Sequence, residues 1–534
     1  MDKVKPEQAN PVRAGVRIQR VMLMNFRKFE TLDIEIGELC VLVGDNESGK
    51  STVLLAIDLA LGGSTTKVMS YGLESLFNKA SISRFETSQK RIEDLPTMHV
   101  EIYLTNVKDP KLNGKNNSCG TELDGIRMEC KPQRDHEPEI AAMLKEPEAG
   151  VPFEYYEVRF HTFADQAYGY FGRPVRHVFI ESAGMQTESA IRDYVRDMYD
   201  SAATDTMRCQ HQRLYREKRK AFCAEVLGDI NSAERVEKFA LRSGGRVSLD
   251  RDLTIESGAV SIEHRGKGIQ SRLKISMALR RAAKSGREIG VVLLEEPENH
   301  LSHVNMREMV DEIRRTNGHQ IVVATHNSLI VSRLDLRKCV LMNKPKASAG
   351  SLADVNKETA EFFMKAPSQG LLEFVLSPRV MLVEGAAEFM LMDAFFEKET
   401  GATAASNGVH VISVNGLSFQ RYVEIARLLG IRAAVVRDND GDYDKNCNEP
   451  FADVPNCVKV FAEKDGNLST FEKCVYACNK DLCDRLFGTE RRTRTVEDYM
   501  LAEKSEAAYS LATKGYGELT TPQYLKEAVQ WVVA

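Results

Sequence analysis

The chain has 534 residues, 43% of them hydrophobic and 28% charged, a composition typical of a globular protein of two to four domains. Its net charge of −5 excludes a generally basic coat for nucleic acid, so any DNA contact must come from local patches. No apolar run could span a bilayer, no secretory signal is recognisable, and the eleven cysteines are odd in number. A cytoplasmic protein with reduced thiols and no membrane partner is therefore expected.

The first informative stretch is residues 39–60. Residues 39–43 are apolar and predict a buried strand, and residues 52–60 continue with helical periodicity. Between them the chain reads G-x-x-x-x-G-K-S, a P-loop, in which glycines let backbone amides surround phosphate, lysine supplies charge and serine ligates Mg²⁺. Ser51 is the metal ligand expected here. The residues expected to bind ATP are Gly44, Asn46, Gly49, Lys50, Ser51 and Thr52.

The segments after the P-loop alternate between strand patterns and polar stretches. Strands are expected at 98–105, 153–163 and 176–182, whereas the Lys, Asn, Gly, Pro and Glu of 106–150 predict a long surface excursion. Residues 187–240 predict a helical insertion with a basic run at 208–220. That run is either a solvated helix face or part of an arm for dimerisation or DNA contact. Strands are expected again around 246–262.

Two further apolar strands end in residues suited to ATP hydrolysis. VVLLEEPE, within residues 290–302, is typical of a Walker B element, which delivers Glu295 to the Mg²⁺ shell and Glu296 to the attacking water. Glu295 stands where aspartate is more usual. His326 follows the strand at 320–325 and is placed to sense the γ-phosphate, although a histidine there could instead be structural.

The turn RGKGIQ, followed by an amphipathic helix to about residue 284, resembles the signature motif of ABC-type ATPases without its serine-rich start. The order P-loop, signature-like turn, acidic strand and histidine strand resembles the ABC ATPase heads of the SMC class. This resemblance implies that two heads sandwich ATP, so the protein would be a homo-oligomer, at least a dimer. Gly266, Gly268 and Gln270 would then contact the nucleotide of a second subunit.

Residues 343–378 change in composition and predict a linker, after which strand patterns return in a second, smaller α/β unit. Glu384 and Glu388 follow one predicted strand, and Asp438 and Asp440 end another. Carboxylates at the carboxyl ends of parallel strands meet at one edge of a sheet. Oxygen ligands favour Mg²⁺ or Mn²⁺, and two such ions suit phosphodiester cleavage. A calcium loop or a simple acidic turn is the alternative, but the EF-hand spacing fails.

The pattern E-G-x-x-E, followed by a strand ending in D-x-D, resembles a Toprim domain. An ABC-type ATPase followed by a Toprim domain is the architecture of the overcoming-lysogenization-defect (OLD) nucleases, and this resemblance covers essentially the whole chain. It implies that Lys504, or else Lys514, stabilises transition-state charge beside catalytic Glu384, Asp438 and Asp440. The metal ligands that it implies are Glu384, Glu388, Asp438, Asp440 and Glu472.

The expected fold class is therefore α/β, an ABC/SMC-type P-loop ATPase with a helical insertion, followed by a smaller α/β Toprim domain. The ATPase is expected at 1–186 and 241–342, with the insertion at 187–240 between its two parts. A linker at 343–378 would lead to the Toprim nuclease domain with its C-terminal helices, at 379–534.

The function implied by the resemblance is an ATP-binding and ATP-hydrolysing, Mg²⁺- or Mn²⁺-dependent DNA endonuclease or nickase, whose ATPase dimer regulates the Toprim site. The family includes phage-defence effectors, which implies an antiviral role and leaves room for a second defence-system component as partner. One alternative is a nucleotide-gated sensor or scaffold whose Toprim domain only binds a partner, although four acids on strand ends argue against a silent site. Another is an SMC-like DNA-repair ATPase, but the long heptad arms are missing.

Overall fold

The computed structural model divides the chain into two compact units. The first is Met1–His326 with Lys344–Ala349, and the second is Asn327–Asn343 with Gly350–Ala534. None of the helices in the described part of the chain is long and apolar enough to cross a membrane. The structure describes residues 15–534 except 147–148, 182–194, 197, 201, 228–240, 242–248, 259, 281–289, 300, 316–319, 343–349, 366–369, 416–418 and 489–493.

An antiparallel sheet forms one layer of the first unit. Its strands run in the order β2-β1-β4-β6, and β6 also pairs with β5 and β7. Buried and exposed positions alternate along several of these strands because one face of the sheet is covered. The strands are β1 (Arg17–Phe26), β2 (Phe29–Glu35), β4 (Met98–Thr105), β5 (Asn113–Gly114), β6 (Leu123–Pro132) and β7 (Tyr156–Thr162).

A parallel sheet carries the expected ATPase motifs at one edge. Its strands β3 (Leu39–Val43), β12 (Gln320–Thr325), β11 (Val291–Glu295) and β8 (His177–Glu181) lie side by side in that order. β3, β11 and β12 are apolar almost throughout because both of their faces are covered. Their register brings the carboxyl ends of these three strands together, which positions the segments that follow them.

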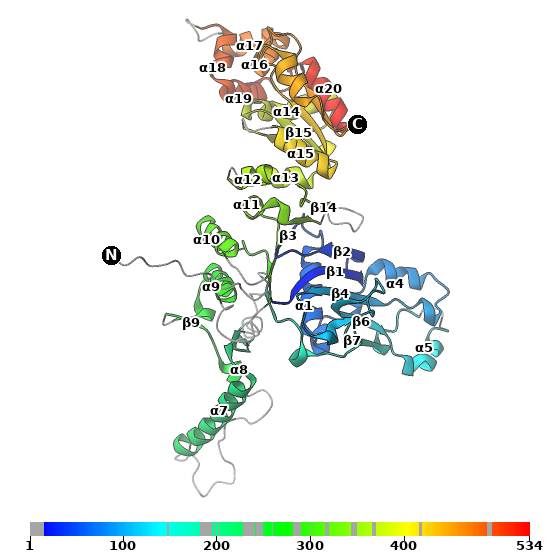
Figure 1. Cartoon of the computed structure of the whole chain (residues 1–534). Helices are drawn as coiled ribbons and strands as arrows, with labels where there is room; N and C mark the ends of the chain where they lie inside the picture. Colours follow the sequence, from blue (N-terminus) through cyan, green and yellow to red (C-terminus); the bar gives the residue numbers. More distant parts are fainter. Residues whose placement is uncertain are drawn as a thin grey trace. The chain divides into compact units, whose positions relative to one another are not determined.

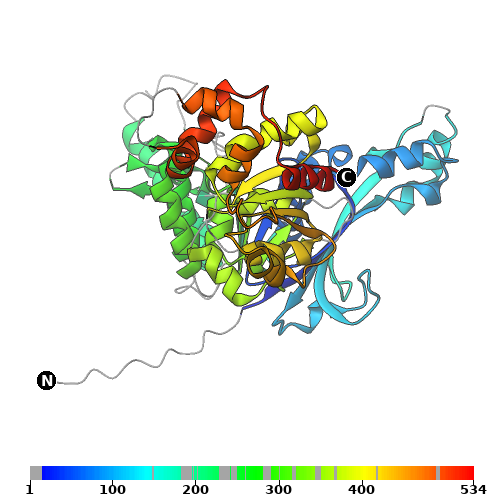
Figure 2. The same ribbon diagram turned by 90° about the horizontal axis from the view of Figure 1, so that it is seen from above.

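Helix α1 (Lys50–Gly62) packs against strands of both sheets. Twelve of its thirteen residues are buried, which agrees with a helix that is apolar nearly all round. Other helices of this unit include α2 (Thr65–Ser70), α3 (Leu73–Leu76), α4 (Lys79–Glu86), α5 (Glu137–Met143), α7 (Asp205–Val226), α9 (Lys267–Arg280) and α10 (His303–Arg315). Figures 1 and 2 show α4 and α5 together at one end of the antiparallel sheet, where they share a small apolar cluster.

Two stretches of the first unit differ from the sequence expectations. The surface excursion expected at 106–150 contains β6, which pairs with β4 along its length, because Ile126, Met128 and Cys130 alternate with polar residues. The strands expected at 246–262 are reduced to the two-residue strands β9 (Glu256–Ser257) and β10 (Val260–Ser261), after a helical turn α8 (Leu249–Asp252). Part of the insertion expected at 187–240 lies outside the described residues, but 205–226 form the helix α7.

The second unit is built on a four-stranded parallel sheet in the order β16-β15-β17-β18. These strands are β15 (Arg379–Val383), β16 (His410–Ser413), β17 (Arg432–Val436) and β18 (Val458–Phe461). Helices α14 (Ala386–Thr400) and α20 (Gln523–Val533) contact the sheet, as do α13 (Leu371–Leu376) and α15 (Phe419–Leu429). This α/β arrangement, with acids at the ends of β15 and β17, confirms the expected fold class.

The remaining elements of the second unit include two helices inside the segment expected as a linker. α12 (Lys357–Lys365) and α13 bury Phe363, Leu371 and Phe374, so these residues belong to the packed unit. The polar residues that precede α12 make its short amphipathic pattern difficult to recognise in the sequence. The other elements are α11 (Ser328–Arg333), β13 (Cys339–Leu341), β14 (Gly350–Ser351), α16 (Phe471–Cys478), α17 (Lys480–Phe487), α18 (Val496–Ala502) and α19 (Lys504–Lys514).

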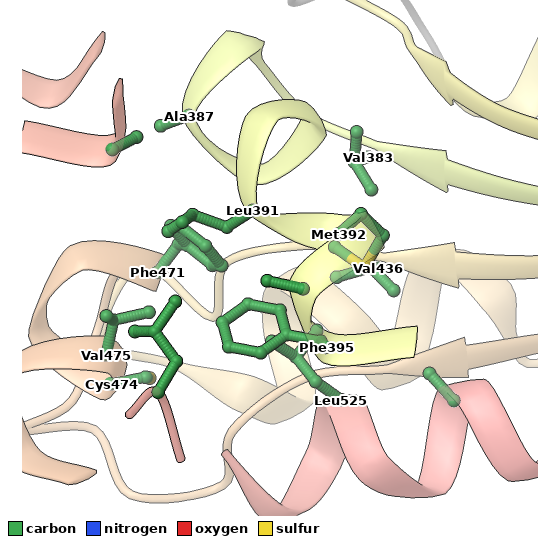
Figure 3. Close-up of a cluster of buried hydrophobic side chains, with 14 of the residues drawn as sticks. Val383, Ala387, Leu391, Met392, Phe395, Val436, Phe471, Cys474, Val475 and Leu525 are labelled. Carbon is green, nitrogen blue, oxygen red and sulfur yellow. The ribbon is translucent and has the colours of Figure 1, made fainter. Parts of the chain in front are cut away.

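Figure 3 shows part of the apolar core of the second unit, in which side chains of α14, α16 and α20 meet those of the sheet. Val383, Ala387 and Phe471 are each buried in this core, and each immediately precedes one of the expected metal ligands. The Phe395 and Phe471 rings meet edge to face at a centroid distance of 6.4 Å. Packing of Val383, Ala387 and Phe471 therefore fixes the points at which the neighbouring carboxylates emerge from the core.

Candidate ATPase and nuclease sites

The P-loop lysine is held by its own loop. Lys50 is 5% exposed, and its Nζ donates to the carbonyl oxygens of Gly44 at 2.7 Å and Asp45 at 2.8 Å. Burial lowers the pKa of Lys50, while the nearby carboxylates of Glu296 and Glu298 oppose that shift. To reach a nucleotide, the ammonium group would exchange these carbonyls for phosphate oxygens, which are stronger acceptors.

Gly49 is required by the shape of the loop. It precedes α1 with a φ of 103°, in the left-handed region that favours glycine. A Cβ at this position would lie 2.3 Å from the Phe29 ring. Gly49 therefore lets the loop turn directly into the N-terminus of α1, the arrangement that binds phosphate. Ser51 and Thr52 lie in the first turn of that helix, and Asn46 is exposed on the loop.

The Walker B strand and the histidine strand bring their terminal residues together. Glu295 ends β11 and is 9% exposed, and the next residue, Glu296, lies 3.3 Å from His326 between Oε1 and Nδ1. Asn299 donates to the second Glu296 oxygen at 2.8 Å. The Glu296 amide donates to the Ala324 carbonyl on the neighbouring strand at 2.8 Å. Parallel pairing of β11 with β12 thus places an acid and a histidine side by side near Lys50.

Glu298 belongs to the same group, although the sequence analysis did not single it out. It is 8% exposed, accepts a hydrogen bond from Thr325 at 2.6 Å, and lies 3.8 Å from His326. Its other oxygen is buried without a hydrogen-bond partner among the described residues, and burial raises the pKa of this carboxyl group. Its place as the third glutamate of EEPE is the only signal in the sequence, and sequence alone does not show that it turns inward.

The signature-like turn forms the start of α9. Gly266 immediately precedes this helix, and Gly268 lies in its first turn. Gln270 is 6% exposed, and its side-chain amide donates to the Arg265 carbonyl at 2.7 Å. The Gln270 side chain therefore stabilises the turn within this chain, and its contact with the nucleotide of a second subunit stays a prediction.

The carboxylates of the second unit gather at the carboxyl ends of β15 and β17. Glu384 follows β15, and its Oε1 accepts the Asp438 amide at 3.1 Å. Glu388, in the first turn of α14, is 7% exposed and accepts the Gly385 amide at 3.2 Å. Glu472, in the first turn of α16, is 4% exposed and accepts from Lys504 Nζ at 3.0 Å. Four segments far apart in sequence thus meet at one place.

The charges in this cluster act on one another. Burial, reinforced by the carboxylates of Glu384, Glu388 and Glu472, raises the pKa of Asp438 to about 8. Burial likewise raises the pKa values of Glu384 and Glu388. Burial alone would lower the pKa of Lys504, but its hydrogen bond to Glu472 and the nearby acids raise it overall. The site therefore holds more negative charge than its own residues neutralise.

Lys504 and Lys514 lie at opposite ends of α19. Ten residues of helix separate them by about 15 Å. Lys504 is the one that contacts the acidic cluster, through Glu472. Asp440 lies on the turn after Asp438 with a φ of 48°, and its charge acts on Glu384.

The chemistry of this cluster fits a divalent cation. Carboxylate oxygens are the ligands that Mg²⁺ and Mn²⁺ prefer, and a cation would offset the charge that raises the pKa of Asp438. Within the described residues, no three His, Cys, Asp or Glu side chains are arranged to hold one ion. Side-chain rotation would therefore have to accompany metal binding. Together the fold and these two sites define a P-loop ATPase joined to an acid-lined α/β unit.

Family models match both parts of this architecture. A model described as Overcoming lysogenization defect protein-like, TOPRIM domain, matches residues 375–440. An AAA domain model matches residues 20–149, which contain the P-loop. A second AAA domain model, described as putative AbiEii toxin, Type IV TA system, matches residues 225–332, which contain the Walker B strand and His326.

Individual relatives match along most of the chain. Endonuclease GajA of Bacillus cereus is 22% identical over 451 residues, which cover 80% of this chain and 75% of GajA. The OLD nuclease of Thermus scotoductus is 23% identical over 471 residues, 79% of this chain and 82% of that protein. Among solved structures, the C-terminal region of the Xanthomonas campestris pv. campestris OLD protein is 22% identical. That match covers 29% of this chain and 92% of the other, with a TM-score of 0.23.

By these matches the chain resembles the OLD nucleases, with AAA domain matches followed by an OLD-like Toprim match, in the order that the sequence motifs indicated.

Proposed function

We propose that this protein is an ATP-regulated, divalent-metal-dependent DNA endonuclease or nickase. The observation that carries the proposal is the partly buried cluster of acids beside Lys504 at the end of a parallel sheet, formed by Glu384, Glu388, Asp438 and Glu472. The names of the two relatives, an endonuclease and an OLD nuclease, support nuclease chemistry in a chain of this architecture.

The residues of this site would have two roles in phosphodiester cleavage, metal binding and stabilisation of phosphate charge. Glu384, Glu388, Asp438, Asp440 and Glu472 would hold one or two divalent ions. Such ions, when bound, supply Lewis acidity and lower the pKa of water. Lys504, which is half exposed, would turn from Glu472 toward the phosphate and offset its developing negative charge. Burial of Glu388 and Glu472 excludes water from their inner side and strengthens the charge interactions that they make.

ATP would act as a control input rather than as the main substrate. Lys50 and the P-loop amides would bind its phosphates, with Ser51 and Glu295 holding Mg²⁺. Glu296, oriented by Asn299 and His326, would position the attacking water. An ATP-bound dimer of heads, and a role in antiviral defence, follow from the family resemblance and form part of this proposal.

A plasmid-nicking assay tests the nuclease proposal. Supercoiled DNA is incubated with the full chain and Mg²⁺ or Mn²⁺, and relaxed or linear product is measured. Asp438→Asn and Glu384→Gln should each lower cleavage at least 100-fold, because each removes a charge that holds the metal, while ATP binding stays intact. Asp442→Asn is the matched control, since Asp442 is an exposed acid on the same turn.

The outcomes separate the proposal from its main alternative. Cleavage by the wild type and by Asp442→Asn, but not by the other two variants, supports a Toprim nuclease. Metal-dependent cutting that survives Asp438→Asn would refute the assignment of this site. A wild-type chain that binds ATP but cuts no DNA under any of these conditions would instead favour the sensor or scaffold function.

A further inference from the structure

The residue between the two aspartates of the D-x-D turn is the most completely buried polar side chain near the acidic cluster. Asn439 is 1% exposed. Its Nδ2 donates to the carbonyl oxygens of Glu463 at 2.7 Å and Asp465 at 3.0 Å, and its Oδ1 accepts the Gly441 amide at 2.8 Å. Both side-chain donors and the acceptor are therefore used, and all three bonds go to backbone.

The backbone carbonyl of Asn439 is equally occupied. It accepts from the Asn446 side chain at 2.8 Å and from the Asp442 amide at 2.9 Å. Asn446 lies in a π-helical turn, Asp444–Asn448, a rare conformation that is frequent at functional sites. Asn439 thus joins the D-x-D turn to a second local structure, as well as to the loop after β18.

These bonds connect the segments that carry the acids. Residues 463–465 belong to the loop that leads from β18 into α16, where Glu472 lies. In the same loop, the carbonyl oxygen of Ser469 accepts a hydrogen bond from the Asp440 amide at 3.1 Å. Asp440 has a φ of 48° and Gly441 a φ of 86°, so the turn is left-handed at two successive residues. Such a turn holds its shape only where surrounding contacts determine it.

We propose that Asn439 is a positioning residue of the nuclease site. It fixes the D-x-D turn against the loop that leads to Glu472, so that Asp438, Asp440 and Glu472 are presented to the same metal. Asn439 itself touches neither metal nor DNA, because its polar atoms are all bonded to backbone. This inference rests on the proposed function, and it adds a residue that neither the acidic motif nor its spacing identifies.

The test is Mn²⁺ binding to the full chain, measured by calorimetry and by the electron paramagnetic resonance of free Mn²⁺. Asn439→Ala should weaken Mn²⁺ binding about 10- to 100-fold, as the loss of a residue that orients metal ligands generally does. Cleavage should recover toward the wild-type rate at saturating Mn²⁺, because Asn439 does not contact the DNA. Asn439→Ser, which keeps an acceptor for the turn but loses both amide donors, serves if the alanine variant does not fold.

Asn407→Ala is the matched control for lost stability. The Asn407 amide donates to the Ala402 and Thr403 carbonyls in a loop beyond the far end of α14. A similar fall in melting temperature with unchanged Mn²⁺ affinity is expected for this variant. If it weakens Mn²⁺ binding as much as Asn439→Ala does, the positioning role is refuted.

The remaining outcomes distinguish this inference from the function on which it rests. Wild-type Mn²⁺ binding that Asp438→Asn abolishes, together with unchanged affinity in Asn439→Ala and Asn439→Ser, would overturn the positioning role and leave the nuclease proposal standing. A wild-type chain without an Asp438-dependent Mn²⁺ site would overturn both.

Discussion

At the scale of single residues, both sites depend on positions that hold backbone rather than on the charged groups alone. Gly49 keeps the P-loop open beside the Phe29 ring, and Asn439 fixes the turn between two aspartates. Neither residue carries the chemistry. Each determines whether its charged neighbours, Lys50 in one site and Asp438 in the other, stand where a phosphate or a metal would be.

Gly49→Ala tests this point in the ATPase site. We expect ATP binding to weaken at least tenfold, since a φ of 103° is strained for alanine and the new Cβ would clash with the Phe29 ring. Binding of a fluorescent ATP analogue measures the effect. Gly62→Ala, at the last position of α1, adds a Cβ that meets no neighbouring atom of the described residues within 4 Å and should bind the analogue normally. Equal binding by both variants would contradict the steric argument.

At the scale of elements, helix α1 is linked to two other elements of the first unit by one of its buried side chains. Its buried Asp58 joins it to α2 through Lys67, whose Nζ lies 2.9 Å from Oδ2. Asp58 also links α1 to β8 through His177, whose Nε2 lies 2.9 Å from Asp58 Oδ1. Burial alone would raise the pKa of Asp58, but Lys67 and His177 outweigh burial and lower the pKa to about 2. An ionised group inside the fold therefore links three elements.

Asp58→Asn should destabilise the first unit by about 3 kcal/mol at pH 7, because it removes the buried charge that Lys67 and His177 both contact. Thermal unfolding followed by circular dichroism gives the measurement. Glu30→Gln is the control, since Glu30 pairs with Arg84 on the surface, where such a pair contributes about 0–1 kcal/mol. Similar losses in the two variants would show that burial of Asp58 is not what matters.

The pH dependence of this effect has a definite sign. The pKa of Asp58 is lower in the folded state than its ordinary value near 4, so its ionised form stabilises the fold. That contribution is complete above about pH 4 and is lost as the pH falls toward about 2. The difference in melting temperature between wild type and Asp58→Asn should therefore shrink below about pH 4. A difference that grew on acidification would contradict the ion-pair explanation.

At the scale of the whole molecule, two compact units each carry one site at the carboxyl edge of a parallel sheet. The proposed coupling makes ATP binding at one site a signal for cleavage at the other. In the first unit Lys50 is bonded to its own loop, a state that nucleotide must displace. Communication between the sites is therefore measurable as an effect of ATP on DNA cleavage.

Lys50→Ala tests that coupling. The wild-type cleavage rate should change when ATP is added. The rate of Lys50→Ala, whatever its value without ATP, should not respond to the nucleotide, because the charge that binds the terminal phosphates is gone. Nicking assays with and without ATP, alongside ATP-binding measurements, give both quantities. An ATP response that persists when ATP binding is lost would exclude control through the P-loop.

Several parts of the molecule are predictable because their signals are local. The strand, glycine turn and helix around Lys50 lie within twenty-two consecutive residues, 39–60, and the structure has β3 and α1 there. The acids at the ends of β15 and β17 were predicted for a similar reason, since a parallel sheet brings such strand ends to one edge. Glu472 and Lys504 were each named from the family resemblance, but their contact was not predicted, because no local pattern joins two helices that far apart.

Other parts were missed because a short pattern lay inside a polar stretch. β6 was read as surface because the alternation of Ile126, Met128 and Cys130 is brief and its flanks are rich in charge and glycine. α12 lies in the segment expected as a linker for the same reason, and burial of Ala360 and Phe363 shows that it packs. Glu298 and Asn439 were missed differently: both stand beside recognised motifs, but a polar side chain's inward direction depends on partners distant in sequence.

The sequence by itself determined the class of fold, the order of the motifs and the residues that carry charge, because these follow from periodicity and from chemistry within short segments. Tertiary structure decided which charges meet. It placed Glu296 against His326, and it brought Glu472 to the cluster of Asp438. The physical reason is that hydrogen bonds and charge interactions act over a few ångströms, and only the packed sheets bring residues so far apart in the chain within that distance.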